Sequence, residues 1–220
     1  MDGLLRQYEL LSDEEKNALL IYKSRLSYVI NNMNIKTESN LKELEDIYVY
    51  YKNVLNSPLN IFIKKVFINI NFETFTKFME SMQRIYDILE SIKGKLILED
   101  DVTLYRGVSI NKGDSLDKIS LGNLISTSMN PNVIKNFHIF GPYTKVVYEM
   151  HIKAGTPVMI VPYSIVVNNE GILKIINNDR QNEIILYKDT LDMEFINTKI
   201  EDDTTIITVD TNSKTLNSHI

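Results

Sequence analysis

The sequence predicts an α+β fold, with helices in the first half of the chain and strands in the second. Apolar residues recur at helical spacing as far as Gly94, whereas runs that alternate between apolar and polar residues, such as 145–152, follow it. Helices followed by antiparallel-type strands are typical of this class. The chain has 220 residues, of which 44% are hydrophobic, so it can build one substantial core.

The first predicted helix follows a capping box. Ser12 and Glu15 can each accept a hydrogen bond from the other's backbone N–H, which satisfies two donors that a helix start leaves unpaired. Behind this box an apolar stripe at helical spacing continues as far as Met33. We therefore expect one helix from the capping box to the end of this stripe.

Two further helices are predicted before the strands begin. One covers about 38–55 and is stopped by Ser57-Pro58, because the residue before a proline avoids the helical conformation. The other covers about 72–92, and Gly94 offers it a left-handed stop. Residues 59–70 fit a strand and a short buried helix equally well.

The second half of the chain reads as strands separated by turn-forming clusters of Asn, Asp and Gly. The predicted strands are 102–105, 145–152, 158–161, 183–187 and 204–209. No repeat, linker or break in composition marks a boundary. We predict a single domain over residues 1–220, helical over about 1–94 and β-rich over about 95–210, with a frayed tail.

Charge and composition exclude several classes of protein. Twenty-nine acidic residues against 24 basic ones leave a formal net charge of −5, which argues against a protein that coats nucleic-acid phosphates. The absence of cysteine removes disulfides, thiolate nucleophiles and most structural zinc sites, and the three histidines lack metal-ligand spacing. Neither a phosphate-binding loop nor a dinucleotide fingerprint is present. No Ser–His–Asp set supports nucleophilic hydrolysis.

We expect no contact with a membrane. The first residues lack the basic region and the uninterrupted apolar run of a signal peptide. The longest apolar run, 158–167, is interrupted by Pro162 and is far shorter than the roughly 20 residues of a membrane-spanning helix. We therefore expect the protein to act in the cytoplasm of the cell that holds it, including a host cell into which it is delivered.

Three short polar elements stand out in the second half. The first ends the predicted strand 102–105, and the second places three hydroxyls directly after a short apolar strand. In Leu104-Tyr105-Arg106-Gly107, an arginine at a strand end can present its guanidinium to a phosphate while the glycine lets a ligand approach the backbone. A surface salt bridge is the alternative. In Asn123-Leu124-Ile125-Ser126-Thr127-Ser128, two serines share one strand face and can order a carboxylate or a ribose. A Ser/Thr turn at a strand end is the alternative there.

The third element, Gln181-Asn182-Glu183, precedes the apolar run 184–187. Gln181 and Glu183 share one face at the mouth of a strand, where a carboxylate can be buried at the edge of a cleft beside an amide. A polar loop before a core strand is the alternative. The combination of the three elements is much more specific than any one of them.

Together the three elements resemble the signature of mono-ADP-ribosyltransferases of the Arg–Ser–Glu class. This class includes clostridial actin- and Rho-modifying exoenzymes, related insecticidal toxins and phage-encoded transferases. Residues 11–16 with 27–32 are similar to the family's early helix, which brings a Tyr and an Asn to the NAD pocket. Asn123 also matches, and Asn136-Phe137 is similar to the opening of the loop that covers the NAD. The resemblance covers roughly residues 10–210.

The resemblance implies a fold of two packed, twisted antiparallel sheets around an NAD cleft, and it implies a role for each matched residue. Arg106 would bind the diphosphate, and the backbone of Gly107 would bind the nicotinamide amide. Ser126 would hold Glu183, which would bind the 2′-hydroxyl of the nicotinamide ribose, while Gln181 would orient the acceptor. The residues expected to contact NAD are Arg106, Gly107, Tyr28, Asn32, Asn123, Thr127, Ser128 and Phe137. No metal is implied, because the leaving nicotinamide is already cationic in NAD.

The residue at position 181 bears on the acceptor. In this family Glu at this position accompanies arginine acceptors, whereas Gln accompanies asparagine acceptors or guanine bases. We therefore predict transfer to a host protein side chain other than arginine, and the acidic net charge makes a nucleic acid the less favoured acceptor. The alternatives are arginine-specific transfer, NAD hydrolysis and a non-catalytic binding module. Intact Arg106, Ser126 and Glu183 argue against the binding module.

Two departures from the family pattern concern the target. The stretch between Gly155 and Gln181 is longer than in compact members, and residues 177–180 lack the aromatic residue often found in the substrate-recognition turn. Both leave the target open, and neither affects the residues expected to carry the chemistry.

Overall fold

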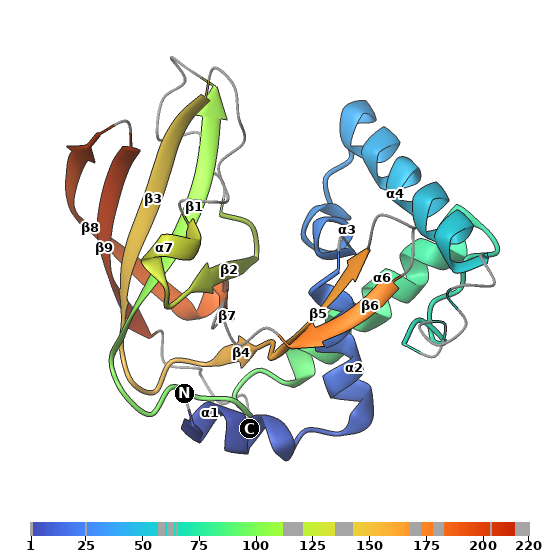
Figure 1. Cartoon of the computed structure of the whole chain (residues 1–220), viewed down its shortest axis with the longest axis horizontal. Helices are drawn as coiled ribbons and strands as arrows, with labels where there is room; N and C mark the ends of the chain where they lie inside the picture. Colours follow the sequence, from blue (N-terminus) through green and yellow to red (C-terminus); the bar gives the residue numbers. More distant parts are fainter. Residues whose placement is uncertain are drawn as a thin grey trace. The chain divides into compact units, whose positions relative to one another are not determined.

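Helices precede strands along most of the chain (Figure 1). The computed structural model describes residues 2–24, 26–56, 60, 64, 66–111, 121–134, 143–167, 173–177, 183–202 and 204–213. Contacts within the chain gather into two compact units. Unit 1 comprises Met1–Glu9, Gly94–Ile160 and Arg180–Ile220, and unit 2 comprises Leu10–Lys93 and Val161–Asp179. The predicted α+β class is confirmed, while the organisation of the chain as a single domain stays a prediction.

Unit 2 is built mainly from helices. They are α2 (Asp13–Tyr22), α3 (Leu26–Asn32), α4 (Glu38–Asn56) and α6 (Phe75–Ser91). The helices predicted over 38–55 and 72–92 are confirmed to within a few residues, and Gly94 has the predicted left-handed conformation with φ 87°. Leu44, Phe78 and Met82 are fully buried and form part of the core of these helices.

The capping box is present, but the long first helix is not. Ser12 Oγ accepts from the N–H of Glu15, whose carboxylate accepts from the N–H of Ser12. The prediction of one continuous helix is wrong, because α2 ends at Tyr22 and a separate helix, α3, begins at Leu26. The Ser24 hydroxyl causes this break by donating to the carbonyl of Ile21 and accepting from the N–H of Leu26, since a serine can offer the backbone such local partners in place of helix bonds.

Replacing Ser12 with Ala is expected to lower the free energy of unfolding by about 0.5–2 kcal/mol, because the N–H of Glu15 loses its side-chain acceptor. Denaturant titration checks this. Ser12→Asp keeps an acceptor at the same position and is the matched control, expected to stay within a few tenths of a kcal/mol of the unmodified protein. Equal stability of the Ala variant and the unmodified protein would contradict the role of the box.

Unit 2 also contains a two-stranded antiparallel sheet that the sequence did not predict. It pairs β5 (Tyr163–Val167) with β6 (Leu173–Asn177), and β5 contacts α2. Within the ambiguous stretch 59–70, the described residues 66–69 form a turn.

Unit 1 is built around a sheet of seven strands among the described residues, in the order β4-β7-β2-β1-β3-β9-β8. The strands are β1 (Val102–Asn111), β2 (Leu124–Ser128), β3 (Tyr143–Ile152), β4 (Val158–Ile160), β7 (Glu183–Tyr187), β8 (Leu191–Glu201) and β9 (Thr204–Ser213). A short helix, α7 (Pro131–Ile134), contacts β1 and β2. A 3-10 turn, Lys188–Thr190, leads from β7 to β8.

The sheet consists of two parts that are joined by one residue pair. The strands β4-β7-β2 form one part and β1-β3-β9-β8 the other, and only Tyr105 and Ser128 are registered between β1 and β2. The expectation of two antiparallel sheets is therefore corrected, because the described strands of unit 1 form one continuous sheet. The expectation that all strands pair antiparallel is also wrong, because β9 runs parallel to β3. The hairpin of β8 and β9 places its second strand beside β3, which produces the parallel pair.

Helix α1 (Asp2–Glu9) belongs to unit 1 and was not predicted. The side-chain amide of Gln7 donates to the carbonyl of Ile97 at 3.2 Å and accepts from its N–H at 2.7 Å. This pair of bonds ties the helix to a residue 90 positions away, a contact that local patterns do not reveal. In the described part of the chain, no helix is long and apolar enough to cross a membrane.

Candidate active site on strands β1, β2 and β7

The first part of the candidate site lies where β1 meets β2. Beyond the single pair of Tyr105 and Ser128, the backbone ladder between these strands is not formed. Beyond that pair, a side chain bridges the two strands: Nη1 of the Arg106 guanidinium donates to the backbone carbonyl of Ser126 at 3.1 Å. Arg106 is partly buried, so the junction of the two parts of the sheet carries a fixed positive charge.

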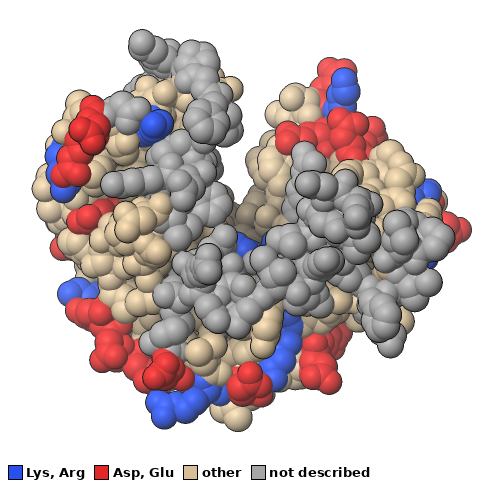
Figure 2. Space-filling model, in the orientation of Figure 1, with Lys and Arg blue, Asp and Glu red and all other residues tan. Residues whose placement is uncertain are grey.

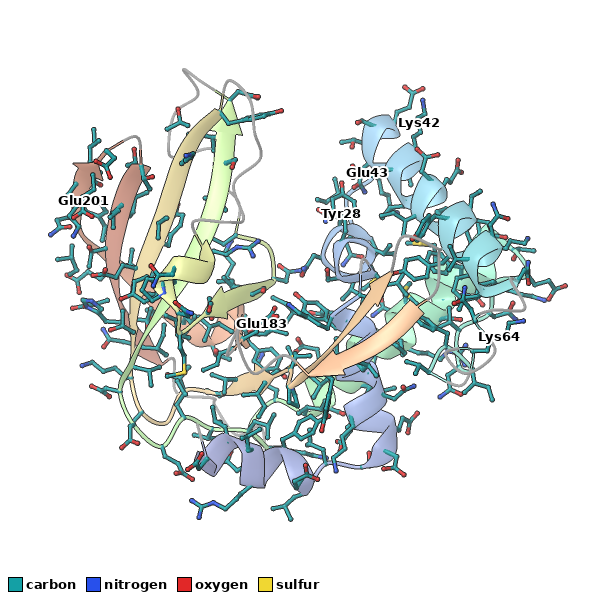
Figure 3. The ribbon with its side chains drawn as sticks, viewed as in Figure 1. Tyr28, Lys42, Glu43, Lys64, Glu183 and Glu201 are labelled. Carbon is teal, nitrogen blue, oxygen red and sulfur yellow. The ribbon has the colours of Figure 1, made fainter. Side chains whose placement is uncertain are left out.

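The second part of the site is formed by β2 and β7, which pair over five residues. Glu183 lies opposite Ser128 in this register, and Ser126 is its diagonal neighbour on the same face. The hydroxyl of Ser126 donates a hydrogen bond to Oε1 of Glu183. Glu183 is only 7% exposed, so this carboxylate is held in a mostly buried position (Figure 3).

Ser126 therefore links the two charged residues. Its backbone carbonyl accepts from Arg106 and its side chain donates to Glu183. Arg106 and Glu183 are 77 positions apart in the sequence, and each is placed by its own strand. The arrangement holds a cation and a carboxylate on either side of one strand residue, which suits a ligand that has an anionic group close to a centre of developing positive charge.

The neighbours of Ser126 on β2 make structural contacts. Thr127 Oγ1 donates to the carbonyl of Ile184 at 2.5 Å and so fastens β2 to β7. Ser128 Oγ accepts from the N–H of Asn130 at 3.0 Å, which forms the Ser/Thr turn that was the alternative interpretation of this strand end. The predicted contacts of Thr127 and Ser128 with NAD stay predictions.

Gly107 and Asn123 lie on the same two strands or next to them. Gly107 pairs with Val147 of β3, one residue beyond Arg106. Asn123 directly precedes β2, its side chain is exposed, and its carbonyl accepts from the N–H of Lys188 at 2.9 Å. Their contacts with NAD stay predictions as well.

Tyr28 and Asn32 lie together on α3 in unit 2. The hydroxyl of Tyr28 donates to Glu43 of α4 at 2.6 Å (Figure 3), and Asn32 Nδ2 donates to the carbonyl of Tyr28. Burial and the Glu43 carboxylate raise the pKa of Tyr28 to about 12, so its phenol stays neutral at physiological pH. Both side chains are anchored within unit 2, and their predicted place beside the NAD stays a prediction.

Two of the predicted residues, Gln181 and Phe137, lie outside the described residues. Among the residues that are described, no group of three His, Asp or Glu side chains could hold a metal ion.

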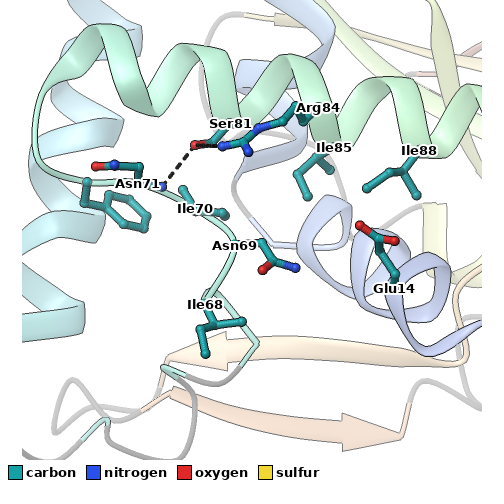
Figure 4. Close-up of a pocket in the computed structure, with 10 residues that line it drawn as sticks. Glu14, Ile68, Asn69, Ile70, Asn71, Ser81, Arg84, Ile85 and Ile88 are labelled. Carbon is teal, nitrogen blue, oxygen red and sulfur yellow. Dashed lines mark hydrogen bonds between the residues drawn. The ribbon is translucent and has the colours of Figure 1, made fainter.

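Unit 2 also contains a pocket of about 630 Å³, lined by α6, the start of α2 and residues 68–72 (Figure 4). Its lining combines isoleucine side chains with Glu14 and Arg84, and the hydroxyl of Ser81 accepts from the N–H of Asn71 at 3.0 Å. None of the residues predicted to contact NAD lines it.

Sequence reasoning missed one residue beside the site. Tyr148 of β3 is registered directly opposite Arg106. The alternating run 145–152 predicted the strand, but the partner of each residue depends on the register of β1 and β3. No local signal identifies that register.

Comparison with solved structures defines the class of fold, which is that of ADP-ribosyltransferase toxins. No family model and no curated protein sequence matches the chain. Among solved structures, it is similar to the Vis toxin, an ADP-ribosyltransferase from Vibrio splendidus, at 16% identity over 97% of this chain and 79% of that chain, with a TM-score of 0.51.

For two further solved structures, the match includes a larger share of the solved chain. Plx2a, an ADP-ribosyltransferase toxin from Paenibacillus larvae, is 16% identical over 97% of this chain and 92% of that chain, with a TM-score of 0.53. C3stau2 from S. aureus, determined with NAD, is 14% identical with the same coverage and TM-score. At these identities the likeness establishes the fold, and the predicted resemblance to mono-ADP-ribosyltransferases is confirmed at that level.

Proposed function

We propose that this protein is an NAD-dependent mono-ADP-ribosyltransferase, which transfers ADP-ribose from NAD to a macromolecule and releases nicotinamide. The observation that carries the proposal is the pair of hydrogen bonds by which Ser126 on β2 joins Arg106 on β1 to Glu183 on β7. These three strands belong to a sheet whose fold is that of ADP-ribosyltransferase toxins. A solved relative of the same fold was determined with NAD, which supports NAD as the co-substrate.

The chemistry of these side chains fits NAD. A guanidinium makes charge-assisted, often bidentate hydrogen bonds to phosphate oxygens, so Arg106 would bind the diphosphate. A carboxylate held by a hydroxyl and withdrawn from water keeps a fixed direction, so Glu183 would meet the nicotinamide ribose with little reorganisation. Gly107 would offer its backbone to the nicotinamide amide.

The reaction breaks the bond between the ribose C1 and the nicotinamide nitrogen. The bond's electron pair leaves with nicotinamide, which becomes neutral, and positive charge develops on the ribose as in glycoside hydrolysis. Glu183 would stabilise that charge, and Ser126 would keep the carboxylate in place. The acceptor nucleophile then forms the new bond to C1 and loses its proton to water.

We propose a protein acceptor other than arginine, in a host cell into which the protein is delivered. An ionised Glu at position 181 could only accept hydrogen bonds, whereas the amide of Gln181 both donates and accepts. A neutral amide suits a neutral acceptor such as an asparagine side chain, while a cationic arginine is better served by a nearby carboxylate. Among the described residues, Figure 2 shows no continuous basic surface on the face in view, so a nucleic-acid acceptor has less support.

The Gln181→Glu variant is expected to modify arginine or to hydrolyse NAD without transfer. Incubation of the purified protein with labelled NAD and host lysate, followed by mass spectrometry of the modified residue, tests this. Gln83→Glu adds the same charge to the exposed face of α6 and serves as the control, expected to keep the original acceptor. Finding ADP-ribose on arginine with the unmodified protein would overturn the proposed acceptor.

A further inference from the structure

Strand β8 forms an outer edge of the sheet in unit 1. It is the last of the described strands in the order β4-β7-β2-β1-β3-β9-β8, and its partner among them is β9 (Figure 1). It spans 11 residues, and every residue after Leu191 is exposed. An edge strand directs a row of backbone N–H and C=O groups away from its sheet, so β8 offers a template on which a further strand can pair.

Apolar side chains lie along this edge. Phe195 is 62% exposed and Ile200 is 75% exposed, and Met193 and Ile196 are exposed as well. A long edge strand that carries exposed apolar side chains favours association with another strand. The opposite edge of the sheet differs, because β4 is only three residues long and all three are buried. We therefore expect the association at β8.

A β-bulge in the middle of β8 limits the ways in which two copies of this strand can pair. Phe195 is registered with Val209 of β9 and Asn197 with Thr208, so β8 contains one extra residue, Ile196. The bulge reverses the alternation of side chains, which places positions 191, 193, 195, 198 and 200 on one face and 192, 194, 197, 199 and 201 on the other. Directly opposed residues of an antiparallel pair share a face, so the part before the bulge has to oppose the part after it.

Two registers over the length of β8 meet this condition. One of them places Asp192 opposite Glu201 of the second copy, so that two carboxylates face each other at each end. The other places Asp192 opposite Lys199, and Phe195 beside Ile196 at the centre. Opposed residues of opposite charge stabilise a strand pair, whereas like charges destabilise it. The second register is therefore favoured, and in it β8 is complementary to itself, with apolar side chains at the centre and opposite charges on either side.

We propose that β8 pairs antiparallel with β8 of a second copy of this chain, in the register that opposes Asp192 and Lys199. The two copies form a two-fold symmetric dimer, and because both use the same edge the contact closes at two copies. Lys199 contacts Glu201 of its own chain at 2.9 Å, and its ammonium has three donors, which is enough to serve both carboxylates. β9 and β3 lie between β8 and β1, so the inference does not depend on the proposed function.

Sedimentation velocity at increasing protein concentration tests for the dimer. The unmodified protein is expected to change from a species of 25.5 kDa to one of twice that mass. Phe195→Lys is expected to raise the dissociation constant about tenfold or more, because it brings two ammonium groups together at the centre of the strand pair. Val49→Lys makes a similar change at an exposed position on α4 and is expected to leave the dissociation constant unchanged.

Two charge variants test the register. Asp192→Lys and Lys199→Asp each place like charges opposite one another, so each alone is expected to raise the dissociation constant about tenfold or more. In an equimolar mixture of the two variants, a lysine again faces an aspartate at both ends. The mixture is therefore expected to dimerise as the unmodified protein does. Mixing would not reverse an effect on the fold of either variant.

Three results would overturn the inference. The first is an unmodified protein that stays monomeric up to near-millimolar concentration, and the second is a dimer that Phe195→Lys leaves unchanged. The third is a mixture of the two charge variants that stays monomeric while thermal unfolding shows both to be folded. None of these measurements uses NAD, so each outcome leaves the proposed function to its own test.

Discussion

Replacing Glu183 with Gln is expected to lower the rate of NAD cleavage by about 100-fold or more, while the affinity for NAD changes little. The amide keeps the shape of the side chain and can still accept the Ser126 hydroxyl. It lacks the negative charge that would stabilise the positive charge developing on the ribose. Because that charge is present only in the transition state, kcat falls and ground-state binding is retained.

Steady-state kinetics of nicotinamide release, together with calorimetric titration of NAD, measure both quantities. Glu194→Gln is the matched control, since it removes the same charge from an exposed position on β8 and is expected to cleave NAD at the normal rate. Near-normal cleavage by the Glu183→Gln variant would mean that the buried carboxylate only stabilises the junction of β2 and β7.

Replacing Arg106 with Lys is expected to weaken NAD binding by about tenfold or more. Hydrogen bonds to charged groups contribute about 1.5–3 kcal/mol each, and a lysine ammonium cannot reproduce the planar fork of a guanidinium. A single ammonium also has to serve both the carbonyl of Ser126 and the diphosphate, which the branched guanidinium can contact with separate nitrogens. The loss is therefore expected in affinity more than in kcat.

Calorimetry with NAD measures this loss, and thermal unfolding shows whether the variant keeps its stability. Arg84→Lys makes the same change on the exposed face of α6 and is expected to bind NAD normally. A variant with an unchanged melting temperature and unchanged NAD affinity would assign Arg106 to the sheet junction alone.

The helices were predictable where local signals agree with the packing. The capping box at Ser12 and the apolar stripes of α4 and α6 each act over a few residues, and the structure has all three. The stripe that continues to Met33 was misleading, because a periodic apolar pattern is unaffected by the hydrogen bonds of the Ser24 side chain. α1 depends on a contact between Gln7 and Ile97 that no local pattern contains.

The sheet was predictable in its strands and less so in their pairing. Runs such as 145–152 alternate along their own length, but alternation does not specify the neighbour or its direction. The parallel pairing of β3 with β9 follows from the placing of the last hairpin, and β5 and β6 form a separate small sheet in unit 2. These features depend on long-range contacts.

The residues of the candidate site were predictable from the sequence, whereas some of their contacts were not. Arg106, Ser126 and Glu183 were selected by their residue types and their resemblance to a family pattern, and in the structure Ser126 contacts both of the other two. The bond from Arg106 to the Ser126 carbonyl could not be predicted, because it depends on the early end of the ladder between β1 and β2. The position of Tyr148 opposite Arg106 required the register of β1 and β3.

Nicotinamide release from NAD by the purified protein, in the presence and absence of host-cell lysate, tests the central claim most directly. We predict that nicotinamide is released, that the rate falls by about 100-fold or more in the Glu183→Gln variant, and that ADP-ribose appears on a protein in the lysate. A folded protein that binds NAD but releases no nicotinamide under either condition would contradict the account and would identify the chain as a non-catalytic binding module.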